Sequence, residues 1–227
     1  MKYRYDIKPN WRRSMAGFTL VELMISTGVF SVVLLICTTA VLVIGQDFHK
    51  AAIASLTQNT SRNIIDNITR ELQYNPSYVI TPAPVYDNSS GVGHYAVCIG
   101  SVRYSYLLDY QLTDSAFDST KKQSLYVLWR DATPLTGCVP VLLNGLAGSL
   151  SGGKELMSLH TRLRATNVFG AGFNVSLVGS NLYNIDVAVI YGDNDVIKDA
   201  DKCVSIRGGG AFCGLSELHT AVFRKAK

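Results

Sequence analysis

One carboxylate stands alone in a long apolar stretch near the start of the chain. Glu22 is the only charged residue between Gly17 and Ile44. An ionised side chain costs about 2.5–3.5 kcal/mol at the centre of a membrane helix and somewhat less near an interface, so such residues usually have partners. The chemistry open to Glu22 is therefore ion pairing, and its position predicts a cationic partner.

The apolar run around Glu22 is long enough to cross a membrane. As a helix, the run from Phe18 to Ile44 would be roughly 40 Å long, which exceeds the ~30 Å hydrocarbon core of a bilayer. A secretory signal has an apolar region of only ~7–15 residues and a small-residue cleavage site after it. Here the run is longer and ends at Gly45-Gln46-Asp47 without an A-x-A pattern. We therefore expect no cleavage after the run.

The start of the run resembles a known processing signal. The motif G-F-T-L-V-E-L begins at Gly17 and follows the basic pair Arg12 and Arg13. It is similar to the class III signal of type IV pilins and of type II secretion pseudopilins. The resemblance implies that a membrane aspartyl peptidase, the prepilin peptidase, cuts between Gly17 and Phe18. It also implies that Phe18 becomes an N-methylated N-terminus and that Glu22 is the assembly glutamate.

Physical reasoning supports this role for Glu22. After cleavage, the protonated α-amine of one subunit and the buried carboxylate of its neighbour would neutralise each other in a helix bundle. Because either charge alone would be costly in a medium of low dielectric constant, the pair would favour one axial register. The alternative is an uncut signal anchor in which the Glu22 side chain reaches to the membrane interface.

The net charge belongs to the leader. The formal net charge is +4, and residues 1–17 contain five basic residues against Asp6, so the predicted mature chain is neutral. Basic residues before a span indicate that the N-terminus is cytoplasmic. The remaining basic residues are dispersed among acids and make nucleic-acid binding unlikely; the candidates for such a patch are Lys121, Lys122, Arg162, Arg164, Arg224, Lys225 and Lys227.

Four segments follow from these patterns. We predict a leader over residues 1–17, a transmembrane and assembly helix over 18–44, an amphipathic continuation over 45–75 and a β-rich extracytoplasmic domain over 76–227. The continuation has an apolar stripe of helical period, formed by Ile53, Leu56, Thr60, Ile64, Ile68 and Leu72. Asn75-Pro76 ends the helix, since proline cannot continue it. Related pilins often carry a proline within this helix, and this chain has none before Pro76.

The rest of the chain alternates with the period of strands. The expected strands cover residues 95–99, 102–108, 124–130, 139–143, 157–165, 172–178, 185–191 and 218–224, with turn clusters between them. Residues 142–150, or a segment starting at Lys154, are alternatively a short helix. A long helix followed by strands predicts an α+β fold with a mostly antiparallel sheet packed on the amphipathic half of the helix, as in pilins.

The cysteines favour two disulfides outside the membrane. Cys98, Cys138, Cys203 and Cys213 lie in the predicted extracytoplasmic domain, where disulfides persist. Four cysteines allow three connectivities. We favour Cys203 with Cys213, because the intervening loop is short and glycine-rich, which leaves Cys98 with Cys138. Cys37 lies within the span.

No enzyme or cofactor motif is evident. Asp193, Asp195, Asp199 and Asp201 are dense enough to be weak candidates for Ca²⁺, but their order does not match a calcium-binding loop and a solvated turn is favoured. The four histidines have no metal-ligand spacing. The interpretation is therefore structural: a pilin-like subunit, by its features a minor pilin, that assembles with other pilins into a cell-surface or periplasmic filament. The alternatives are a pseudopilin and an unprocessed, membrane-anchored binding module.

Overall fold

A computed structural model gives the fold of this chain. It describes residues 17–75, 79–86, 91–113, 117–132, 137–142, 152–164, 172–192, 196–198, 202–203 and 212–224. The chain divides into two compact units, Met1–Gly45 and Gln46–Lys227. One long helix followed by β-sheets confirms the predicted α+β class.

The helix α1 covers Leu20–Tyr74 and ends where the sequence predicts. Asn75 follows it, and the Asn75 amide still donates to the Glu71 carbonyl at 2.9 Å. The buried residues of α1 all lie in its second half: Ile53, Thr57, Thr60, Ser61, Ile64, Ile68 and Leu72. The predicted stripe is thus correct except at Leu56, which is 38% exposed, while Thr57 and Ser61 take the buried positions beside it.

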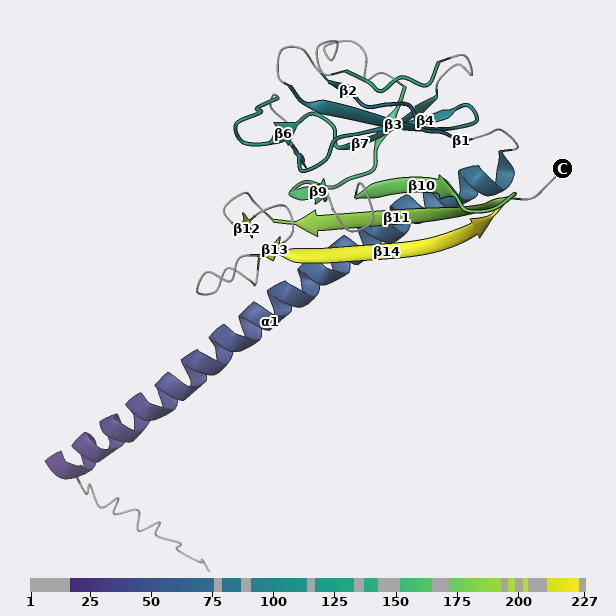
Figure 1. The fold of residues 1–227 in the computed structure, drawn as a ribbon. Coiled ribbons are helices and arrows are strands. Elements are labelled where there is room, and N and C mark those ends of the chain that lie inside the picture. The colour runs from purple at the N-terminus through teal and green to yellow at the C-terminus, as the bar shows by residue number, and fades with distance from the viewer. Residues whose placement is uncertain are drawn as a thin grey trace, which may run out of the picture. The chain divides into compact units, whose positions relative to one another are not determined.

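The first sheet contains six strands joined by antiparallel pairs (Figure 1). Its order is β1-β3-β4-β7-β8, and β2 also pairs with β3. The strands are β1 (Val79–Ile80), β2 (Val85–Tyr86), β3 (Gly93–Ile99), β4 (Val102–Tyr106), β7 (Leu128–Ala132) and β8 (Lys154–Glu155). The β3–β4 turn needs Gly100, because its φ is 61° and a Cβ there would lie 2.3 Å from the Asn75 side chain.

The second sheet is centred on β11 and lies face to face with the first (Figure 1). Its order is β10-β11-β9-β5-β6, with β14 on the other side of β11 and one parallel pair, β5 with β6. The strands are β5 (Gln111–Leu112), β6 (Gln123–Ser124), β9 (Thr161–Leu163), β10 (Phe173–Leu177), β11 (Leu182–Tyr191) and β14 (Gly214–Phe223). A separate antiparallel pair consists of β12 (Ile197–Lys198) and β13 (Lys202–Cys203).

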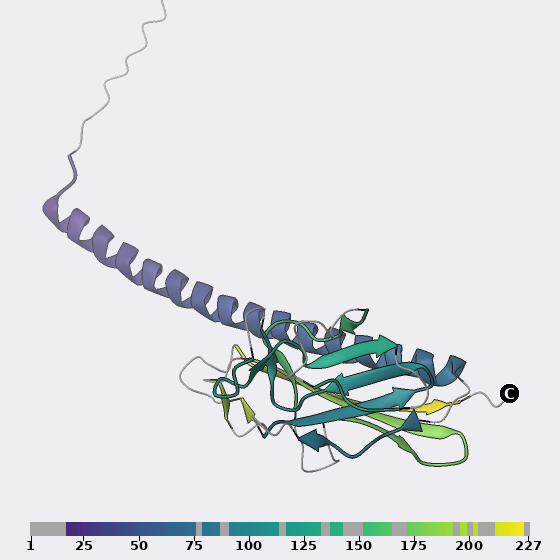
Figure 2. The same cartoon turned by 90° about the horizontal axis from the view of Figure 1, so that it is seen from above.

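The main core joins both sheets to the second half of α1. Ile64 and Ile68 of the helix pack in one cluster with Tyr104 and Tyr106 of the first sheet and Phe173 of the second. The Tyr106 and Phe173 rings meet edge to face, with centroids 4.9 Å apart. Figure 2 shows this half of α1 running alongside the strands. Because its apolar stripe is buried in this cluster, the second half of α1 is an integral part of the domain.

Residues 137–142 cover the outer face of the first sheet. The sequence predicts a strand over 139–143, but residues 139–142 form none. Instead, Arg103 Nη1 donates to the Val139 carbonyl at 2.8 Å, and the Val141 amide donates to Ser105 Oγ at 3.1 Å. Val141 also packs with Tyr126 and Leu107 in a second apolar cluster. Contacts from side chains of the sheet therefore replace backbone pairing in this segment.

Most other expected strands are present with shifted ends. β3, β4, β10, β11 and β14 overlap the predicted ranges, and the segment at Lys154, for which a short helix is the alternative prediction, forms β8. The predicted strand over 124–130 is split between β6 and β7, and the one over 157–165 shortens to β9. The alternative helix at 142–150 lies almost entirely outside the described residues.

Candidate functional site

The first turn of α1 carries a reciprocal hydrogen-bond pair. The Glu22 amide donates to Thr19 Oγ1 at 3.2 Å, and the Thr19 amide donates to Glu22 Oε2 at 2.9 Å. The Thr19 hydroxyl also donates to the same carboxylate oxygen at 3.0 Å. This is a capping box, in which Thr19 is the N-cap and Glu22 the third helical residue. Glu22 therefore stabilises the start of its own helix, a role that the sequence reasoning missed although the T-x-x-E spacing signals it.

The candidate cleavage peptide lies just before this capping box. Gly17, Phe18 and Thr19 precede the first helical residue, Leu20, and all are exposed. Phe18 is 81% exposed, and no neighbouring atom lies within 4 Å of the position that a Cβ on Gly17 would occupy. The candidate Gly17-Phe18 bond therefore lies in an exposed segment outside regular structure.

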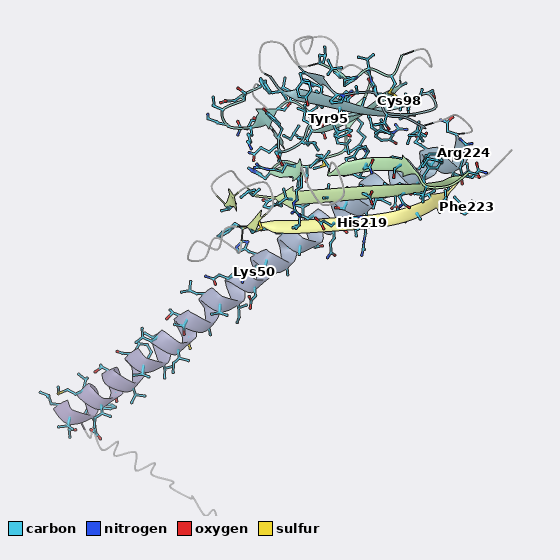
Figure 3. The ribbon with its side chains drawn as sticks, viewed as in Figure 1. Lys50, Tyr95, Cys98, His219, Phe223 and Arg224 are labelled. Atoms are coloured by element: carbon cyan, nitrogen blue, oxygen red, sulfur yellow. A yellow bond between two sulfur atoms is a disulfide. The ribbon has the colours of Figure 1, made fainter. Side chains whose placement is uncertain are left out.

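The first half of α1 presents apolar side chains on every side (Figure 3). By length and composition, α1 is able to cross a membrane. Large apolar side chains from Leu20 to Ile44 are 48–75% exposed. An isolated helix that is apolar all round needs lipid or other helices around it. The helix and the motif support membrane anchoring of this chain.

Hydroxyl groups along this half of α1 are satisfied within the helix. Thr27 Oγ1 donates to the Leu23 carbonyl at 3.0 Å, and Ser31 Oγ donates to the Thr27 carbonyl at 2.8 Å. Thr38 and Thr39 make the same kind of bond to carbonyls three and four residues earlier. Polar atoms satisfied in this way add little cost in lipid, where unpaired groups cost several kcal/mol. Glu22 thus remains the one ionisable residue of the apolar run apart from Cys37, which is an exposed free thiol.

Both favoured disulfides are present in the structure. Cys98 of β3 is bonded to Cys138, with Cα atoms 5.9 Å apart, and Figure 3 marks Cys98 within the first sheet. Cys203 of β13 is bonded to Cys213, with Cα atoms 5.6 Å apart. The first bond fixes the covering segment 137–142 to the sheet, and the second fixes β13 to the residue that precedes β14.

Ion pairs and a buried carboxylate tie distant parts of the domain together. Arg130 of β7 pairs with Glu71 of α1, and Arg103 pairs with Asp131 across β4 and β7. Glu155 accepts from the amides of Val127 and Leu128 at 3.0 Å each. Burial raises the pKa of Glu155, against the lowering effect of these amides. These contacts connect α1, β4, β7 and β8 and thereby stabilise the fold.

Among the other candidate residues, Arg162 and Arg164 lie in different surroundings. Arg162 is buried and donates to Gln111 Oε1 at 2.8 Å, whereas Arg164 pairs with Glu217 at the surface. They therefore belong to different environments rather than one basic patch. The calcium candidates Asp193, Asp195, Asp199 and Asp201 lie outside the described residues, as do Lys225 and Lys227. Within the described ranges no group of three potential metal ligands occurs.

Comparison with known proteins identifies the N-terminal segment. Residues 12–38 match the family model described as the prokaryotic N-terminal methylation motif, the class III signal of type IV pilins and pseudopilins. No curated protein and no solved structure matches the chain. The match covers Gly17, Phe18, the capping box and most of the apolar run. It indicates a structural protein of the pilin type and does not extend into the β-rich domain.

Proposed function

We propose that this chain is the precursor of a subunit of a type IV pilus-like filament. Prepilin peptidase cuts it between Gly17 and Phe18, the new α-amine of Phe18 is methylated, and the mature helix packs with those of other subunits. The match of residues 12–38 to the methylation motif carries this proposal. The geometry supports it, because the exposed Gly17-Phe18 bond lies outside the helix and the capping box begins at the second mature residue.

Cleavage supplies the charge that assembly needs. Before cleavage, the Glu22 carboxylate accepts hydrogen bonds from Thr19 at the start of the helix. Cleavage creates a cationic α-amine at Phe18, which pairs with Glu22 of a neighbouring subunit. Lipid tails are as apolar as leucine, so burial of apolar side chains alone gives little preference between helix registers. The ion pair therefore selects the register, and an uncut chain cannot form it.

The orientation follows from the charges at the ends of the run. Arg12 and Arg13 stay in the cytoplasm by the positive-inside rule. The domain then lies outside the cytoplasm, where the bonds Cys98–Cys138 and Cys203–Cys213 are chemically stable. After assembly the domain forms the outer surface of a cell-surface or periplasmic filament.

A minor pilin is the role that we favour within this class. The domain is large, and α1 runs without a proline from Leu20 to Tyr74. A pseudopilin of a type II secretion apparatus carries the same signal and is the second candidate. Deleting the gene of this subunit separates the two candidates, since only the machine that uses the subunit, the pilus or the secretion apparatus, should lose function with it.

The test of the proposal is the mass and N-terminal sequence of the chain isolated with and without prepilin peptidase. With the peptidase, we expect residues 1–17 to be missing and Phe18 to carry one additional methyl group. Without it, the chain should begin at Met1. A Gly17→Val variant is the matched control and should stay uncut, because the added side chain lies at the scissile bond. A wild-type chain that keeps its first seventeen residues in the presence of an active peptidase would refute the proposal.

A further inference from the structure

An apolar groove opens between the second half of α1, the end of β11 and the residue before Cys213. It has a volume of about 690 Å³. Its lining includes His49, Ile53, Leu56, His160, Tyr191 and Phe212. All of these residues belong to the unit Gln46–Lys227. The groove is separate from the capping box and from the cleavage peptide, and neither cleavage nor register selection uses it.

Two exposed phenylalanine side chains stand beside the groove. Phe48 is 72% exposed and Phe212 is 52% exposed. The His49 ring makes contact with both, with ring centroids 6.3 Å from Phe48 and 5.7 Å from Phe212. Segments that are more than 160 residues apart in sequence thus form one apolar rim. Such a contiguous apolar surface marks an interaction site more often than single exposed residues do.

The walls of the groove are built with close backbone contacts. A Cβ on Gly214 would lie 2.6 Å from Ile53 Cγ2, so only glycine lets β14 begin this close to α1. Gly192 has a φ of 141°, and a Cβ there would lie 2.9 Å from Val196 Cγ2. The Cys203–Cys213 bond holds the residue next to Phe212. The groove is therefore a preformed part of the domain.

Chain connectivity keeps the rim near the end of the membrane span. Phe48 follows Ile44, the last residue of the apolar run, by four helical residues, which is an axial rise of about 6 Å. The polar layer on each side of the hydrocarbon core is about 5–8 Å thick. Phe48 therefore lies at the level of the lipid headgroups, and Phe212 stays with it through His49.

We propose that the groove and its rim, Phe48, His49, Leu56 and Phe212, dock on the headgroup and upper acyl region of the bilayer that α1 crosses. Aromatic rings combined with polar atoms are typical of the membrane interface, and His49 and the neighbouring Lys50 supply the polar part. In the sequence, only residues 45–47 separate Phe48 from the apolar run. The proposal rests on membrane anchoring alone and does not require cleavage or filament assembly.

Docking at this surface has a consequence for the membrane-bound subunit. It holds the domain against the outer leaflet, so the domain does not swing freely about the span. When the subunit leaves the membrane, the rim must lose its lipid contacts and become covered by another surface. Lipid contact at Phe212 is thus a property of the unassembled subunit.

Tryptophan substitution tests this contact directly. The full-length, uncut chain is placed in phospholipid vesicles whose acyl chains are brominated near the headgroup end, since bromine quenches tryptophan fluorescence at short range. The two variants are Phe212→Trp and Phe223→Trp. Phe223 is the matched control because it is 70% exposed and ends β14, ten residues long, which is about 30 Å from the start of that strand. Figure 3 shows Phe223 at the opposite end of the domain from Lys50.

Trp11 and Trp129 contribute the same background fluorescence to both variants. This background is measured on the unsubstituted chain and subtracted. We expect the Phe212→Trp signal to be quenched by brominated lipid about twofold or more relative to unbrominated vesicles, as for side chains seated ~5–10 Å into the interface, and the Phe223→Trp signal to be unchanged. Equal quenching of the two variants would overturn the proposal. It would also be overturned if the Phe212→Trp emission were insensitive to bromine and shifted to the blue with rising protein-to-lipid ratio, because a second copy would then cover the rim.

Discussion

Thr19 and Glu22 hold each other at the start of α1: each backbone amide donates to the side chain of the other residue, at 2.9 Å and 3.2 Å. The Glu22 carboxylate thereby caps the helix before any neighbouring subunit is present. It has two acceptor oxygens and only one of them, Oε2, takes the bonds from Thr19. Capping by Oε2 leaves Oε1 for the proposed bond with the α-amine of a second subunit, so the two roles are compatible in one side chain.

The two roles of Glu22 can be separated by substitution. Glutamine at this position keeps an acceptor for the Thr19 amide and serves in a capping box as well as glutamate does. It has no charge for the α-amine. We expect Glu22→Gln to be inserted, cut after Gly17 and methylated normally but to be lost from filaments. Sheared filaments are assayed with an antibody to the domain, and the intact mass reports processing.

Thr19→Val is the complementary variant. It removes the hydroxyl from the capping box but leaves the charge of Glu22, and loss of an N-cap costs about 0.5–2 kcal/mol of local helix stability. We therefore expect reduced rather than abolished filament content. Normal filament content in Glu22→Gln would contradict the proposed ion pair, whatever the result for Thr19→Val.

The helix stripe gives a prediction about the stability of the domain. Ile64 is fully buried in the main core, whereas Leu56 on the same predicted stripe is 38% exposed. We expect Ile64→Ala to lower the free energy of unfolding by about 2–5 kcal/mol, and Leu56→Ala to lower it by about 1 kcal/mol or less. Urea unfolding of the detergent-solubilised chain, followed by Trp129 fluorescence, measures both. Similar losses for the two variants would mean that Leu56 is buried as the sequence pattern predicts.

Local rules made the helical parts predictable. The end of α1 follows from Asn75-Pro76, since proline removes a donor and clashes with the preceding turn. The period of the stripe identifies the buried face, but it cannot distinguish Leu56 from Thr57, which lie only one position apart. Thr57 is tolerated in the core because its hydroxyl donates to the Ile53 carbonyl at 3.1 Å. The choice between the two depends on where the sheets lie, and the sequence does not reveal that.

Non-local contacts explain the wrong strand prediction. Residues 139–142 have the composition of a strand, but their partners are Arg103 and Ser105, which come from the middle of β4. The Cys98–Cys138 bond fixes this arrangement. The T-x-x-E spacing of the capping box, by contrast, is a local signal and was available in the sequence. The roles of Gly17, Phe18 and Glu22 follow from the signal motif alone and stay predictions.

The two disulfides are expected to contribute unequally to stability. Cys98 and Cys138 are 40 positions apart, and Cys203 and Cys213 are 10 apart. The loop-entropy relation gives about 4 kcal/mol for the first bond and about 3 kcal/mol for the second. We therefore expect the paired replacement of Cys98 and Cys138 by serine to lower the urea midpoint more than the paired replacement of Cys203 and Cys213. The reverse order would show that closure of the groove wall, rather than loop entropy, dominates.

Tyr104 predicts how stability changes at alkaline pH. Burial raises the pKa of its hydroxyl from 10.0 to about 12. Between these values the unfolded chain has lost a proton that the folded chain retains, so the free energy of unfolding falls as pH rises from 10 towards 12. At about 1.4 kcal/mol per pH unit, the loss approaches about 3 kcal/mol. Tyr104→Phe has no such proton, and its free energy of unfolding, measured by urea titration at several pH values, should fall correspondingly less than that of the wild type. Parallel curves for the two chains between pH 10 and pH 12 would mean that water reaches the Tyr104 hydroxyl in the folded domain.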